Sequence, residues 1–145
     1  MSIDVTQRNS TRNQSTADFE QKKIFLFDNR FSNGTLKNLT DPAADQTIKA
    51  GQLLFRASTG ELTIVADANY AKLVGVLAID GQVILEGGDS LEVTYCDKGT
   101  VDGGNLVLPG SDTLTTLKNG LTVKDHLQRL GIHVEISTEM TSFDN

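Results

Sequence analysis

Short apolar runs separated by turn residues recur along the chain, and residues 48–78 show this pattern most clearly. Leu53-Leu54-Phe55 and Leu62-Thr63-Ile64-Val65 flank the turn residues Ala57-Ser58-Thr59-Gly60, which predicts a hairpin. Farther along, Gly75 interrupts an apolar run, where a strand can bend or another backbone can approach closely. Because the segment holds no cluster of acids, bases or nucleophiles, it predicts a scaffold of consecutive strands without visible chemistry.

The same pattern predicts strands on both sides of this segment. Leu91, Val93 and Tyr95 alternate with Glu92, Thr94 and Cys96, the period of two expected for a half-buried strand. The expected strands are residues 24–27, 46–48, 52–57, 61–66, 72–79, 82–86, 90–97 and 105–108, with a short one around Leu36 and Leu39. Turns are expected at 32–34 and 87–89, and a hairpin at Asp80-Gly81. Turn signals this regular are typical of an all-β sandwich or barrel.

Residues 121–131 carry a helical pattern instead. Val123, Leu127 and Leu130 lie at spacings of four and three, which forms one apolar stripe. Thr122 suits the N-cap, and Gly131 suits the residue that ends a helix in the left-handed conformation. The alternating residues 132–136 then predict a closing strand.

The N-terminal region changes character at Phe19. Residues 1–18 are rich in Ser, Thr, Asn and Gln, so we expect them to be disordered in isolation, either as a passive tail or as an arm that orders on a partner. Four of the six phenylalanines fall within residues 19–31. They can face the core, as large aromatics usually do, or part of the cluster can lie at an interface.

Composition bounds the class of protein. With 145 residues the chain suits one domain, and it contains neither a secretory signal nor an apolar run of about 20 residues that could span a bilayer. Residues 1–30 carry five basic and four acidic side chains, whereas residues 31–145 carry 8 basic and 15 acidic ones, giving 8 − 15 = −7. An acidic body repels phosphate, which argues against general nucleic-acid binding. A single cysteine suits a reducing cytosol.

Reactive side chains form no recognisable catalytic, cofactor or metal motif. His126 and His133 lack companions at metal-site spacing, so both are interpreted as surface histidines. Cys96 is interpreted as a small apolar packing residue. The carboxylates that border turns do not have the spacing of a calcium loop, and the Gly-Gly pairs are not phosphate-binding motifs. We therefore expect a protein that is not an enzyme and needs no cofactor or metal.

Two segments together resemble a known family. The stretch IKAGQLL, TGELTIV and LVGVL within residues 48–77, followed by LKNGLTVKDHLQRLGIHVE at residues 117–135, resembles the head decoration, or capsid cement, proteins of tailed phages. The family's G-Φ-L step is matched by Gly75-Val76-Leu77, and its G-I-x-V ending by Gly131-Ile132-His133-Val134. The resemblance covers roughly residues 46–136. The phenylalanine cluster at 19–31 and the tail at 137–145 depart from it.

The resemblance implies a mainly β fold, a small β-barrel or β-tulip-like domain with one short C-terminal helix and a flexible N-terminal arm. We assign residues 1–20 to the arm and 21–145 to the single domain. It further implies a homotrimer that binds the major capsid protein on the outer surface of the expanded head, and hence a virion protein made in the host cytoplasm, with no nucleic-acid or membrane partner. The candidate capsid contacts are Phe19, Lys22, Lys23, Ile24, Phe25 and Phe27. Two alternatives stay open: a β-rich carbohydrate- or ligand-binding module of a fibre or surface protein, and, less favoured, a lipoyl- or biotinyl-type carrier domain.

Overall fold

A computed structural model describes residues 24–40, 42–66 and 69–136, and within them the chain forms a closed five-stranded β-barrel. Its strands are β1 (Phe25–Lys37), β4 (Leu62–Ile64), β3 (Leu53–Arg56), β5 (Leu73–Leu77) and β7 (Ser90–Asp102), in that spatial order. Pairing of β1 with β7 closes the barrel. The predicted mainly β fold is thus confirmed, including the barrel and the short helix near its C-terminal end.

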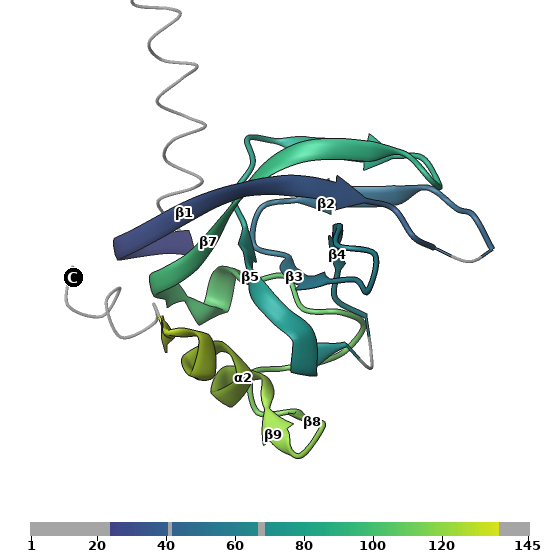
Figure 1. Ribbon diagram of the computed structural model, residues 1–145. Coiled ribbons are helices and arrows are strands. Elements are labelled where there is room, and N and C mark those ends of the chain that lie inside the picture. The colour runs from purple at the N-terminus through teal and green to yellow at the C-terminus, as the bar shows by residue number, and fades with distance from the viewer. Residues whose placement is uncertain (1–23, 41, 67–68, 137–145) are drawn as a thin grey trace, which may run out of the picture.

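Smaller elements surround the barrel (Figure 1). β10 (Ile132–Glu135) extends the sheet by pairing in parallel with β7. Two separate two-stranded sheets are formed by β2 (Gln46–Lys49) with β6 (Gln82–Leu85), and by β8 (Leu117–Lys118) with β9 (Leu121–Thr122). Two short 3-10 helices, η1 (Tyr70–Lys72) and η2 (Gly103–Asn105), and the α-helix α2 (Val123–Leu130) complete the described elements. The helix and the β8–β9 hairpin lie at the end of the barrel away from the crossing of β1 and β7 (Figure 1).

β3, β5 and the middle of β7 are buried on both faces. Adjacent residues of one strand point into two different hydrophobic clusters. One cluster, with Leu53, Val76 and Cys96, packs with α2 and β10. The other, with Leu54, Leu77 and Tyr95, packs with β2 and β6. Double-sided burial explains why the sequence shows paired apolar residues here instead of strict alternation. The alternation predicted for residues 90–97 accordingly holds for Val93 and Tyr95, but Cys96 is buried as well.

The close backbone approach predicted at Gly75 is confirmed. A Cβ atom at this position would lie inside contact distance of the Cys96 carbonyl oxygen and 2.9 Å from Cδ2 of Tyr95. Residues 75–77 therefore pass so near β7 that glycine alone fits at the first of them. The β3–β4 hairpin around residues 57–60 is confirmed too, with antiparallel pairing of Leu54 to Ile64.

The predicted helix end is also confirmed. The Thr122 hydroxyl accepts a hydrogen bond from the Asp125 backbone N–H at 3.1 Å, which satisfies one of the free N–H groups of the first turn. Gly131 has a φ of 98° and its N–H donates to the Gln128 carbonyl, as expected for a left-handed C-terminal cap. β10 follows directly.

Three local predictions are wrong because distant strands decide the pairing. Residues 32–34 are no turn: Ser32, Asn33 and Gly34 lie inside β1, paired with residues of β7. Asp80-Gly81 does not close a hairpin, since β5 pairs with β3 and β7 while β6 pairs with β2. Residues 105–108 form no strand of their own; Val107 makes an isolated bridge to Gln52.

Candidate interaction surface

The phenylalanines at the start of β1 divide between the core and the surface. Ile24 and Phe25 are buried among the residues that pack with α2 and β10, whereas Phe27 is 51% and Phe31 49% exposed. Phe19, Lys22 and Lys23 lie outside the described residues. Ile24 and Phe25 therefore pack in the core, and Phe27 is the exposed one of the described candidates. Phe31 is added as a further candidate, whereas Phe19, Lys22 and Lys23 stay predictions.

Irregular pairing in β1 explains this division. Phe25 and Phe27 would point to the same side of a regular strand, but the register with β7 shifts between them, again between Phe27 and Arg30, and again before Phe31. Asp28 at the shift has a φ of 56°, an uncommon value for a residue with a side chain. Such bulges bend a strand and redirect its side chains. Sequence alternation alone therefore could not separate Phe25 from Phe27.

Asn29 holds the irregular segment in place. Its side-chain amide donates to the Thr100 carbonyl oxygen at 3.1 Å and to the Cys96 sulfur at 3.6 Å. Opposite it, Gly99 has a φ of 127°, and a Cβ there would lie 2.7 Å from the Asn29 Cα. The backbone that presents Phe27 is thus fixed by specific contacts with β7.

Phe31 stands beside an open groove of about 490 Å³. Its walls come from β1, β7 and the segment after β5, and they carry two carboxylates; the lining residues are Phe31, Ala78, Ile79, Asp80, Glu92, Val93 and Thr94. Glu92 accepts a hydrogen bond from the Thr35 hydroxyl. The Phe31 ring also meets the Phe25 ring edge to face, with centroids 5.4 Å apart, so a buried aromatic supports the exposed one.

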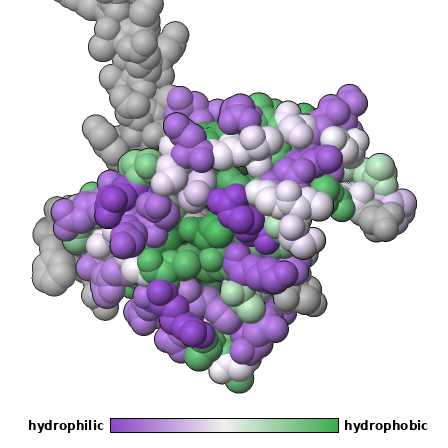
Figure 2. Space-filling model, in the orientation of Figure 1, coloured by the Kyte–Doolittle hydropathy of each residue, from purple (hydrophilic) through white to green (hydrophobic). Residues whose placement is uncertain are grey.

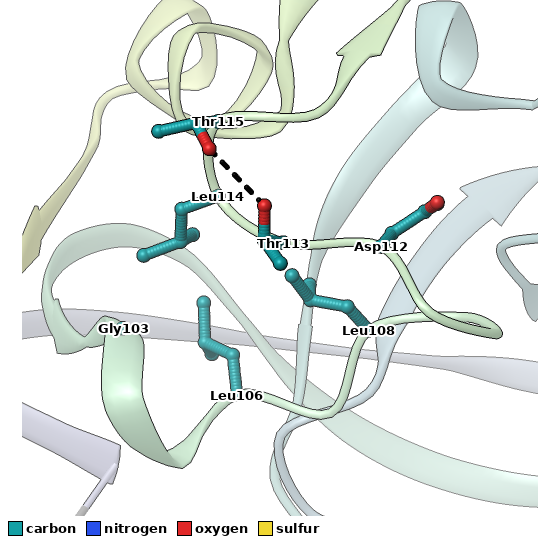
Figure 3. Close-up of a pocket in the computed structure, with 7 residues that line it drawn as sticks. All are labelled: Gly103, Leu106, Leu108, Asp112, Thr113, Leu114 and Thr115. Carbon is teal, nitrogen blue, oxygen red and sulfur yellow. Dashed lines mark hydrogen bonds between the residues drawn. The ribbon is translucent and has the colours of Figure 1, made fainter.

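A second hollow, of about 420 Å³, lies beneath the segment that follows η2 (Figure 3). Leu106, Leu108 and Leu114 point into it, and Thr113 and Thr115 stand at its rim with their hydroxyl oxygens 3.1 Å apart. Asp112 also lines the hollow, and its carboxylate is engaged by the Tyr70 hydroxyl and the Lys118 ammonium. The two threonine hydroxyls contact each other, and in the part of the chain that the structure describes neither one is hydrogen-bonded to a base that could activate it.

The predicted surface position of His126 is wrong. This side chain is 6% exposed; its Nε2 lies 2.5 Å from the Lys118 carbonyl oxygen and its ring lies 5.7 Å from that of Tyr70. Tyr70 in turn donates to Asp112 at 3.0 Å, and the Lys118 ammonium pairs with the same carboxylate at 3.4 Å. His133 is exposed, as expected.

This polar network ties together η1, α2 and the loop before β8. Its histidine nitrogen is engaged by a backbone carbonyl and its carboxylate by a tyrosine and a lysine, an arrangement that satisfies buried polar groups. The sequence signal that could have located His126 inside is its position three residues after Val123, next to the apolar stripe of α2.

Cys96 behaves as the sequence predicts for a packing residue. It is fully buried, and its Sγ lies 3.0 Å from the Lys98 carbonyl oxygen. Burial raises the pKa of the Cys96 thiol, with hydrogen bonding from Asn29 acting in the opposite direction. Its thiol therefore stays protonated and shielded, the opposite of a reactive cysteine.

The described residues contain no group of three or more metal-binding side chains. Nor does any helix within them have the length and apolarity needed to cross a bilayer.

Apolar side chains at the surface are dispersed over several elements. Figure 2 shows one compact apolar area on a face that is otherwise largely hydrophilic. The large exposed apolar residues are Phe27, Phe31, Leu39, Val83, Ile84, Leu117 and Ile136. Within the described ranges, β1 alone contributes two exposed aromatic rings, the residue type that contributes most to protein interfaces.

No protein-family model and no curated protein matches this chain.

Proposed function

We propose that this chain is a head decoration protein of a tailed phage, a non-enzymatic protein that binds the outer surface of the expanded capsid and bridges subunits of the major capsid protein. The observation that carries the proposal is the pair of half-exposed phenylalanines, Phe27 and Phe31, on a backbone fixed by Asn29, at the point where residues 1–23 join the barrel. Exposed aromatic anchors on a rigid support are typical of interfaces.

The segments that resemble the family also pack together. TGELTIV forms the end of the β3–β4 hairpin, LVGVL is β5, and the G-I-x-V ending begins β10. β5 joins β3 to β7, and β10 pairs with the other half of β7. The segments that carry the resemblance thus lie next to one another in one sheet, which supports the proposal.

Stabilisation of the head would follow from mass action. A protein that binds only the assembled, expanded shell lowers the free energy of that state relative to its separated subunits. Many copies on one particle, each engaging as a trimer, would add avidity. In this proposal residues 1–20 act as the arm, and Phe27 and Phe31 act as the aromatic part of the contact.

Co-sedimentation of the purified full chain with expanded and unexpanded heads of the phage that encodes it tests the proposal. We expect binding to expanded heads, and loss of binding for Phe27→Ser. Leu117→Ser is the matched control, because Leu117 is 70% exposed on the β8–β9 hairpin, away from β1. Full-length chain that stays in the supernatant with expanded heads would refute the proposal.

The groove beside Phe31 favours a second candidate, a carbohydrate- or ligand-binding module. An aromatic ring can stack on a sugar, and the carboxylates of Asp80 and Glu92 can accept hydrogen bonds from its hydroxyls. A glycan array separates the two: a hit that Phe31→Ser abolishes supports the module, whereas capsid binding without glycan hits eliminates it.

A further inference from the structure

The chain contains two Asn-Gly dipeptides, Asn33-Gly34 and Asn119-Gly120. The first lies within a paired strand and the second at a hairpin turn. We propose that Asn119 is a site of spontaneous deamidation in the folded protein, whereas the barrel protects Asn33. In this reaction the Gly120 backbone nitrogen loses its proton to solvent base and attacks Cγ of Asn119. The Cγ–Nδ2 bond breaks, and the amide nitrogen takes a proton back from solvent acid and leaves as ammonia, which forms a succinimide ring. Water then opens the ring to aspartate or isoaspartate; nothing is oxidised or reduced.

Asn119 and Gly120 form the exposed tip of the β8–β9 hairpin. Their φ angles are 54° and 83°, both positive, as in the two-residue type I′ turn for which Asn-Gly is the preferred sequence. A Cβ at Gly120 would meet no atom within 4 Å, and both turn residues are exposed, so neighbouring side chains do not cover the turn. Asn119 also borders an open hollow of about 260 Å³, which leaves its side chain room to rotate.

Attack requires the turn to open, because the main-chain nitrogen must reach Cγ. The ladder consists of two residue pairs, Leu117 with Thr122 and Lys118 with Leu121, and it continues below them in the 3.1 Å bond from the Val123 N–H to the Thr116 carbonyl. A hairpin with so short a ladder is marginal by itself. Contacts of Lys118 with His126 and Asp112 hold the residue next to the turn, so opening can be confined to Asn119 and Gly120. The tip can therefore open alone, at a small fraction of the free energy of global unfolding.

Asn33 has the same glycine neighbour and an exposed side chain, but its backbone lies inside a long strand pairing. It pairs with Thr94 within the long β1–β7 ladder, and its Oδ1 accepts a hydrogen bond from the Thr94 hydroxyl at 2.9 Å. A Cβ at Gly34 would lie 2.7 Å from Cδ1 of Leu62, so the glycine is packed against the core. Bringing the Gly34 nitrogen onto the Asn33 side chain requires separating β1 from β7, which opens the barrel. The rate of deamidation at Asn33 should therefore follow the rate of global unfolding.

The two products affect the hairpin differently. Either one makes the formal charge of the chain more negative by one, from −6 to −7. Aspartate keeps a sequence, Asp-Gly, that the type I′ turn accepts. Isoaspartate routes the main chain through Cβ and lengthens it by one carbon, so the two-residue turn can no longer close in the same register. Deamidated molecules thus differ from fresh ones in charge and at the tip beside Lys118.

Incubation of the folded full chain in mildly alkaline buffer, followed by rapid digestion with trypsin and mass spectrometry, tests the proposal. Cleavage after Arg30, Lys37, Lys118 and Lys124 isolates each dipeptide in its own peptide. We expect the acid form to accumulate at Asn119 at least about tenfold faster than at Asn33, since local opening is more frequent than global opening. Asn119→Asp provides the charge standard on an ion-exchange column.

The same incubation in denaturant is the matched control. Without the fold, both dipeptides should convert at similar rates. Equal conversion of Asn33 and Asn119 in the folded chain would overturn the proposal, because the fold would then make no distinction. The proposal would also be overturned if Asn119 stayed intact in the folded chain but deamidated in the denatured chain.

Discussion

Substitution of Gly75 by alanine should strongly destabilise the barrel. The added Cβ would fall inside contact distance of the Cys96 carbonyl oxygen, 2.9 Å from Cδ2 of Tyr95 and 3.1 Å from the Cys96 carbonyl carbon. Two of these are backbone atoms of β7, which cannot rotate away as a flexible side chain could. β5 and β7 would have to separate locally.

The magnitude follows from what that separation disturbs. Overpacking in a core typically costs about 1–3 kcal/mol. The short pairing of β5 with β7, which continues in the 2.9 Å bond from the Ala78 N–H to the Thr94 carbonyl, would weaken by roughly one hydrogen bond, or about 1 kcal/mol. Alanine restricts the unfolded chain and returns about 0.4–1 kcal/mol. Because the added methyl group meets fixed backbone atoms, the upper end of the overpacking range applies and the net loss is roughly 3 kcal/mol, against a total of about 5–15 kcal/mol for a typical domain.

Urea denaturation followed by circular dichroism measures this loss. We expect a lower midpoint with an unchanged m-value, and a melting temperature lower by roughly 6–12 °C. Gly34→Ala is the matched control, because it adds the same methyl group in a strand but meets the methyl end of the Leu62 side chain at 2.7 Å, which can adjust. A loss for Gly75→Ala no larger than that for Gly34→Ala would refute the argument from backbone contact.

Three further substitutions test separate features. Thr122→Ala should lower the free energy of unfolding by about 1 kcal/mol by removing the cap on Asp125, while Thr122→Ser keeps the hydroxyl and should recover most of the loss in the same denaturation assay. Asn38→Ala should cost roughly 2–3 kcal/mol, because the buried amide of Asn38 donates to the Leu85 carbonyl at 2.9 Å and to that of Ala44, which lose their partner; a loss below about 1 kcal/mol would contradict this role. Burial raises the pKa of the Cys96 thiol, so the unfolded chain ionises first and stability should fall as pH rises above 9.0, the ordinary cysteine value. Cys96→Ala should flatten that decline, and a pH titration of the urea midpoint in which wild type and variant decline alike would contradict it.

Local signals predicted the elements whose partners lie nearby in the sequence. The β3–β4 hairpin depends on residues 57–60, and the end of α2 depends on Thr122 and Gly131, so each could be inferred from a short window. The conformation of residues 32–34 could not be inferred in this way, because pairing with β7, about 60 residues away, overrides their turn propensity. A short sequence window contains no information about a pairing partner that far away.

The candidate surface was less predictable than the barrel. Clustering of phenylalanines at residues 19–31 located the region, but Phe25 is buried and Phe27 exposed through register shifts that alternation does not encode. His126 illustrates the same limit: its burial depends on Tyr70 and Lys118, which reach it through the tertiary fold.

The two ends of the described chain flank the same stretch of β7. Phe25 and Val134 both pair with Val101, from opposite edges of that strand, so they lie roughly 10 Å apart at the usual spacing of paired strands. A short linker could join these ends, with new termini opened at the exposed Thr59-Gly60 turn. Such a circular permutant would retain every strand pairing and open only one hairpin turn, and its new ends would lie at the β3–β4 turn instead of beside β7.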